Sequence, residues 1–156
     1  MKFNYSRNGT SPDQPYDFTE LESFGNNNFT KELSDLKTVI DWASDNAKDY
    51  NLDTDRFTLI GHSRSGPIVL ITALNDVRIK SVITWSSVSE LDFAWGNESL
   101  LEDWKKSGVI YTKNARTGQQ MPMYYQLYED FQKHKEEYSV KNTIENVKLN
   151  SVKNIT

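Results

Sequence analysis

A short apolar strand, a sharp turn carrying a serine and an apolar helix follow one another in residues 56–74 and constrain this chain most. The strand, residues 56–60, is rich in β-favouring side chains, and the helix from about Arg64 is apolar nearly all round. A turn this short forces its central residue, Ser63, into a strained backbone at the carboxyl edge of a sheet, above the positive end of a helix. The chain is therefore expected to be an α/β protein with a parallel sheet.

The turn matches the G-x-S-x-G nucleophile elbow of serine hydrolases, with one departure. Gly61 and Ser63 fit, but Ser65 stands at the second glycine position and Gly66 follows one residue later. The alternative is a βα loop whose serines carry no chemistry. A phosphate-cradling loop is disfavoured, because no lysine follows the last glycine.

Length and composition limit the remaining choices. The 156 residues suffice for one domain, and the net charge of −4 argues against nucleic acid or an anionic membrane as the partner. Without cysteine the chain has no disulfide, no thiolate metal site and no thiol nucleophile. We expect no metal and no cofactor in this chain. Neither a signal peptide nor a membrane-spanning run is evident, and a cytoplasmic location is expected.

Other elements follow from hydrophobic periodicity and turn residues. We expect helices at 29–46, 99–106 and 124–138, a second strand at 81–86, and a hairpin of residues 108–112 and 119–123 closed by Gly118. Residues 6–28 are expected to form a long loop, with Asn28 capping the first helix. The polar residues 139–156 are expected to end without a strand.

Several segments together resemble bacterial α/β-hydrolases of the dienelactone-hydrolase-like or prolyl-oligopeptidase-like kind. The segments are residues 4–6, 26–29, 60–64, 78–80, 82–85 and 118–122. The resemblance implies a partial α/β-hydrolase fold that forms a single domain over 1–156. Its core, at about 1–88, would be a parallel sheet with helices on both faces. A cap of helices plus a hairpin would follow at about 89–140, and a polar tail at about 141–156. It also implies Ser63 as the nucleophile and the backbone N–H of Arg64 as an oxyanion donor.

The same resemblance implies that the catalytic base is missing. The family places its acid and then its histidine after the serine, and these would lie beyond Thr156. His62 adjoins the serine in a strained turn and is expected to be packed or hydrogen-bonded, whereas His134 is expected on the solvated side of a helix. Since serine without a base is a poor nucleophile, little or no turnover is expected of the chain alone.

Other polar and aromatic side chains have structural alternatives. Asp53 and Asp55 precede the central strand and fit a turn, and Glu90 and Asp92 follow the second strand, where a loop role outweighs a catalytic one. Six aromatic residues are expected mainly to pack rather than to line an acyl pocket: Trp85, Trp95, Trp104, Tyr111, Tyr124 and Tyr125.

Two functions remain open at this point. The first is an esterase or acyl hydrolase acting on a small-molecule ester, lactone or peptide-like substrate. The second is a non-catalytic fold remnant, or a half-domain that depends on a complementary segment of the same fold. Two parallel strands would leave both sheet edges open and much of the central helix uncovered, so the isolated chain is expected to aggregate or to need a complementary segment.

Overall fold

Residues 1–92, 95, 97–149 and 151–155 are described by a computed structural model, which divides into two compact units. The first unit comprises residues 1–32 and 95–133, and the second residues 33–94 and 134–156. The helices are α1 (Leu21–Gly25), α2 (Phe29–Asp45), α3 (Ser65–Asn75), α4 (Glu98–Ser107), α5 (Gln126–Lys133) and α6 (Val140–Asn146), with a 3-10 turn η1 at Thr54–Arg56. The strands are β1 (Phe57–His62), β2 (Ile79–Trp85), β3 (Val109–Lys113), β4 (Gln120–Tyr124) and β5 (Ser151–Ile155).

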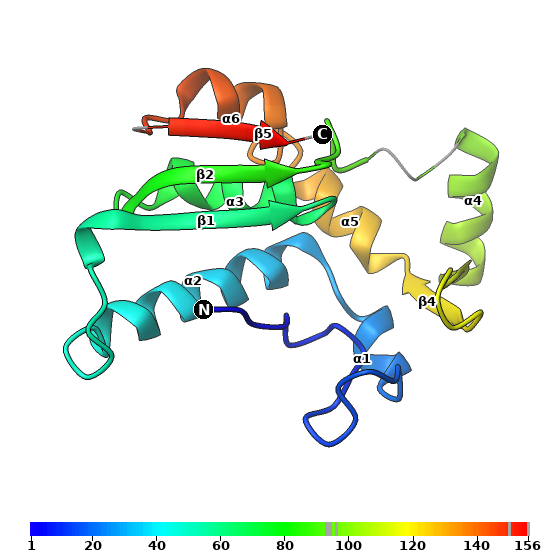
Figure 1. Ribbon diagram of the computed structural model, residues 1–156. Helices are drawn as coiled ribbons and strands as arrows, with labels where there is room; N and C mark the ends of the chain where they lie inside the picture. The colour runs from blue at the N-terminus through cyan, green and yellow to red at the C-terminus, as the bar shows by residue number, and fades with distance from the viewer. Residues whose placement is uncertain (93–94, 96, 150, 156) are drawn as a thin grey trace. The chain divides into compact units, whose positions relative to one another are not determined.

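The second unit is built on a three-stranded parallel sheet in the order β1-β2-β5. In Figure 1 the three strands lie side by side with their arrows pointing the same way. The pairing places Ile60 beside Ile83 and Trp85 between His62 and Ile155. A mixed helix-and-strand chain with a small parallel sheet is confirmed, although the sheet has one strand more than we expected.

Helix α3 supplies the core of this unit. It packs on β1, β2 and α6, and its residues 66–73 are all buried. The expectation that much of this helix is uncovered is therefore wrong. The helix is apolar nearly all round because the sheet covers one side and α6 contributes cover to another.

The face of the sheet opposite α3 is open. The side chains of Ile60, Trp85 and Ile155 are 68%, 54% and 51% exposed. Residues two apart in a strand share a face, which places these three side chains on one surface and Val82, fully buried, on the other. The prediction of helices on both faces is thus wrong for the residues that the structure describes.

The end of the chain contradicts the expectation of a polar tail without a strand. Ser139 caps α6, because its hydroxyl accepts a hydrogen bond from the N–H of Asn142 at 3.2 Å. Strand β5 then pairs in parallel with β2 from Ser81 to Trp85. The strand depends on this distant partner, which a local pattern does not reveal.

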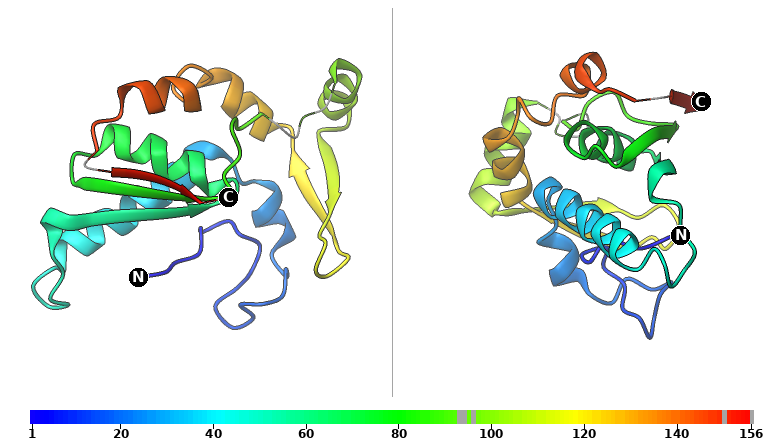
Figure 2. Two further views of the ribbon diagram at one scale, coloured as in Figure 1. Left: turned by 45° about the horizontal axis from the view of Figure 1, so that its top comes forward. Right: turned by 90° about the vertical axis from the view of Figure 1, so that its left-hand side faces the viewer.

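The first unit combines short helices with the expected hairpin. Strands β3 and β4 pair antiparallel, and Gly118 at the turn has φ +71°. Figure 2 (left) shows the hairpin with α4 at its open end. Helix α4 is bounded by Asn97, whose side chain accepts from the N–H of Leu100, and by the left-handed Gly108. Within the predicted loop 6–28 the structure has one short helix, α1.

An aromatic cluster forms the core of the first unit. Trp95 lies edge-on to Phe131 with ring centroids 4.5 Å apart and to Tyr128 at 5.1 Å. Trp104 is fully buried, and its indole N–H donates to the carbonyl oxygen of Met123 at 2.9 Å. Packing, the role expected for most of the aromatic residues, is therefore observed for Trp95 and Trp104, whereas Trp85 and Tyr111 are 54% and 62% exposed. No helix among the described residues combines the length and the apolar character needed to cross a bilayer.

Candidate functional site

Ser63 lies directly between β1 and α3, in a left-handed backbone conformation. Its φ is +53°, a value that residues other than glycine, asparagine and aspartate seldom adopt. The Ser63 N–H donates to the carbonyl oxygen of Trp85 at 2.9 Å, and the N–H of Gly66 donates to the Ser63 carbonyl oxygen at 3.0 Å. The strained turn expected from the sequence is thus present at this serine, which is half-buried.

The two glycines of the motif are each required by a close approach. A Cβ on Gly61 would lie 2.3 Å from the carbonyl oxygen of Ser65, and one on Gly66 would lie 2.1 Å from the hydroxyl oxygen of Ser87. The first contact is made by backbone, the second by the loop that follows β2. The position between them tolerates Ser65, which explains how the chain departs from G-x-S-x-G without losing the turn.

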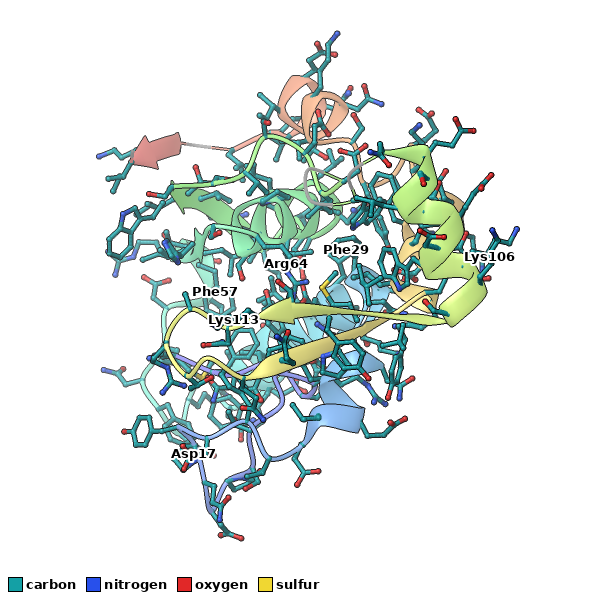
Figure 3. All side chains as sticks on the ribbon, turned by 90° about the vertical axis from the view of Figure 1, so that its right-hand side faces the viewer. Asp17, Phe29, Phe57, Arg64, Lys106 and Lys113 are labelled. Atoms are coloured by element: carbon teal, nitrogen blue, oxygen red, sulfur yellow. The ribbon has the colours of Figure 1, made fainter. Side chains whose placement is uncertain are left out.

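Helix α3 begins immediately beyond the serine. Arg64 is its N-cap residue, with helical backbone angles and no side-chain cap, and Pro67 lies within the first turn, where it removes no intrahelical bond. Figure 3 labels Arg64, which follows Ser63 at the start of α3. The first turn of a helix concentrates positive potential and N–H donors, so an oxyanion formed on a ligand of Ser63 would be stabilised here.

The two histidines contact other side chains. The exposed His62 lies against the indole of Trp85, with ring centroids 5.2 Å apart, on the open face of the sheet. His134 lies beyond the end of α5, where it stacks on Tyr138 and approaches Glu137 with 3.0 Å between Nδ1 and Oε2. His62 contacts the Trp85 ring but is exposed rather than packed in the interior, and His134 is half-buried rather than on a solvated helix face. Within the described part of the chain, the Ser63 hydroxyl makes no hydrogen bond with a histidine.

The carboxylates near the sheet are divided between turns and surface. Asp53 accepts from the N–H of Asp55 at 3.0 Å and from Arg56 Nε at 2.5 Å, which confirms its turn role at the amino end of β1. Glu90 and Asp92 are exposed. Over the described ranges, no three acidic or histidine side chains gather as metal ligands would.

A residue that the sequence analysis did not single out also stands at this edge. Ser86 follows β2 as Ser63 follows β1, and its φ is +44°. The available signal was the repeated order of an aromatic residue and then a serine at the ends of the two strands, His62-Ser63 and Trp85-Ser86. Serine is not a residue that predicts a positive φ, so the local sequence alone did not reveal it.

Comparison with known families gives a match over most of this region. The BD-FAE family model matches residues 19–121, well over half of the chain, and the match includes Ser63, Ser86 and the hairpin turn. The chain belongs to the BD-FAE family. This family is associated with α/β-hydrolase-like esterases, which indicates an esterase-like hydrolase and a small-molecule substrate. No curated protein matches the chain.

Proposed function

We propose that the chain is an esterase or acyl hydrolase of the α/β-hydrolase type with Ser63 as its nucleophile. The observation that carries the proposal is the left-handed backbone of Ser63 between a strand and a buried helix, inside the segment matched by BD-FAE. Holding a serine in this conformation costs about 1 kcal/mol or more, and such strain persists where the surrounding structure and function require it. We also propose that the enzyme is of the dienelactone-hydrolase-like or prolyl-oligopeptidase-like kind, and that residues at about 89–140 form a cap.

The proposed chemistry is transfer of an acyl group to the serine. Ser63 Oγ attacks the carbonyl carbon, the bond to the leaving alcohol breaks, and the proton of Ser63 passes to that alcohol. The backbone N–H of Arg64, at the start of α3, is the proposed donor to the oxyanion. Water then releases the acid and restores the serine. The substrate proposed is a small ester, lactone or peptide-like compound.

Turnover by the isolated chain is proposed to be slow. Both histidines of the sequence contact other side chains, His62 through Trp85 and His134 through Glu137 and Tyr138. A serine hydroxyl without general-base assistance loses about two to four orders of magnitude in rate. We therefore expect acylation to be detectable over hours, and steady hydrolysis of an aryl ester to be close to background.

The test is covalent labelling with a fluorophosphonate, read as adduct mass and mapped by peptide sequencing. We expect one adduct, on Ser63, which disappears in Ser63→Ala and persists in the matched control Ser65→Ala. An unlabelled wild-type chain, or an adduct that survives Ser63→Ala, would overturn the nucleophile assignment and favour the non-catalytic alternative. Fast aryl-ester hydrolysis that depends on Ser63 but survives His62→Ala and His134→Ala would show that the account of slow turnover is wrong.

A further inference from the structure

The carboxyl edge of the sheet carries a second strained serine, Ser86. Among the described residues only Asn51, Ser63 and Ser86 have a positive φ without being glycine. Asparagine is the usual exception at such angles, because its side chain makes local hydrogen bonds. Serine does not favour a positive φ as asparagine does. Each of the two serines directly follows the last residue of a strand, and the two strands are parallel neighbours.

Backbone hydrogen bonds hold the two serines side by side. The N–H of Ser63 donates to the carbonyl oxygen of Trp85 at 2.9 Å, and the N–H of Ser86 donates to that of Ile155 at 2.7 Å. The ladder of the sheet thus continues one residue beyond β1 and β2. Because neighbouring strands lie about 5 Å apart, Ser86 lies about one strand spacing from Ser63.

The structural requirement at position 86 would be met by glycine. The hydrogen bond to Ile155 is made by the backbone, and glycine adopts this φ without strain. Of the five other described positions with positive φ, three have glycine: Gly9, Gly108 and Gly118. Ser86 is exposed, and its hydroxyl hydrogen-bonds no other residue in the part of the chain that the structure describes. The hydroxyl is therefore retained at a cost in stability and without an internal partner.

We propose that Ser86 is a substrate-binding residue of the same site, whose hydroxyl donates a hydrogen bond to an oxygen of the acyl group held on Ser63. This inference rests on the proposed nucleophile. At one strand spacing from Ser63, a hydroxyl reaches a substituent one or two bonds beyond the acyl carbonyl carbon rather than that carbonyl itself. The site then prefers esters of short, oxygen-bearing acids over esters of plain alkyl acids.

The test compares two esters of nearly equal size, 4-nitrophenyl methoxyacetate and 4-nitrophenyl butanoate. The rate of acyl-adduct formation on Ser63 is measured for each by mass spectrometry, and the ratio of the two rates is compared between variants, so that the intrinsic reactivity of the esters cancels. We expect Ser86→Ala to lower the methoxyacetyl-to-butanoyl ratio about fivefold to tenfold, the effect of one lost hydrogen bond. The exposed Ser89→Ala is the control and is expected to keep the wild-type ratio.

The variant Ser86→Gly separates the effect of losing the hydroxyl from the effect of changing the backbone conformation. Glycine keeps the backbone angle without strain, so this variant is expected to melt at or above the wild-type temperature while its acyl ratio falls as in Ser86→Ala. An unchanged ratio in both variants, with Ser63 still acylated, would overturn this inference and leave the nucleophile in place. A wild-type chain that forms no adduct on Ser63 with either ester would overturn both.

Discussion

At Gly66, the absence of a Cβ lets the loop after β2 lie against the first turn of α3. A Cβ there would meet the hydroxyl oxygen of Ser87 at 2.1 Å and its Cβ at 2.6 Å. We expect Gly66→Ala to lower the free energy of unfolding by about 1–3 kcal/mol, the range for overpacking a close contact. Urea unfolding followed by circular dichroism measures this loss.

A second substitution can relieve the loss of stability at Gly66, where the contact is a side chain, but not at Gly61, where the contact is backbone. Replacing Ser87 with glycine removes the two closest atoms, so Gly66→Ala/Ser87→Gly is expected to recover a large part of the loss. Gly61→Ala meets the backbone oxygen of Ser65 at 2.3 Å, which no side-chain change relieves. Gly108→Ala is the matched control, since its Cβ would meet nothing within 4 Å and the cost is backbone strain alone, about 1 kcal/mol. If Gly66→Ala were no more damaging than this control, the close packing would not matter.

At the scale of elements, Arg78 joins α2 to the turn that precedes β2. Its guanidinium donates to Asp41 Oδ1 at 2.7 Å, to Asp76 Oδ2 at 2.5 Å and to the hydroxyl of Ser44 at 3.2 Å. The hydrogen bonds from Arg78 hold the pKa of the Asp76 carboxyl below its ordinary value. The Asp76 side chain is only 13% exposed, so this pair is less screened by solvent than the surface pairs of the chain.

A carboxyl group whose pKa is lower in the folded state stabilises the fold above its unfolded pKa, about 3.9, and loses this contribution as the pH falls through the folded value. We expect Asp76→Asn to lower the free energy of unfolding by about 1 kcal/mol at pH 7, after allowance for solvent screening. The difference from wild type should shrink as the pH falls below 4. Urea titrations at pH 7, 4 and 3 measure it, with the exposed Asp49→Asn as the control. A difference that grows toward low pH would contradict the assignment.

What the sequence predicted at this scale depended on how local the signal was. The helix from Phe29 carries regular apolar spacing and a capping asparagine, Asn28, whose Oδ1 accepts from the N–H of Lys31 at 3.0 Å, and it was predicted to within one residue. The turn at Ser63 was likewise predicted, because its signal lies in one contiguous stretch of sequence. Strand β5 and the angle of Ser86 were missed, because both arise from pairing between β2 and residues about 70 positions away.

At the scale of the whole molecule, each compact unit has a core of its own, but the sheet of the second unit is covered on one face only. Ile60 and Val82 illustrate the difference, since they lie in adjacent strands at 68% and 0% exposure. The strands β1 and β5 at the two edges also carry unpaired backbone groups in the described sheet. An apolar face bounded by two open edges favours association between copies, as the sequence had suggested.

Threonine substitutions on the open and the covered face of the sheet distinguish an effect on association between copies from an effect on the stability of the fold. Ile60→Thr keeps a β-branched residue on the open face, so we expect the free energy of unfolding to change by less than about 0.5 kcal/mol while the aggregated fraction in light scattering falls. Val82→Thr buries a hydroxyl on the covered face and is expected to cost about 1–3 kcal/mol without reducing association. Association that is unchanged in Ile60→Thr, or a wild-type chain that stays monomeric through a sharp reversible melt, would show that the open face does not drive self-association.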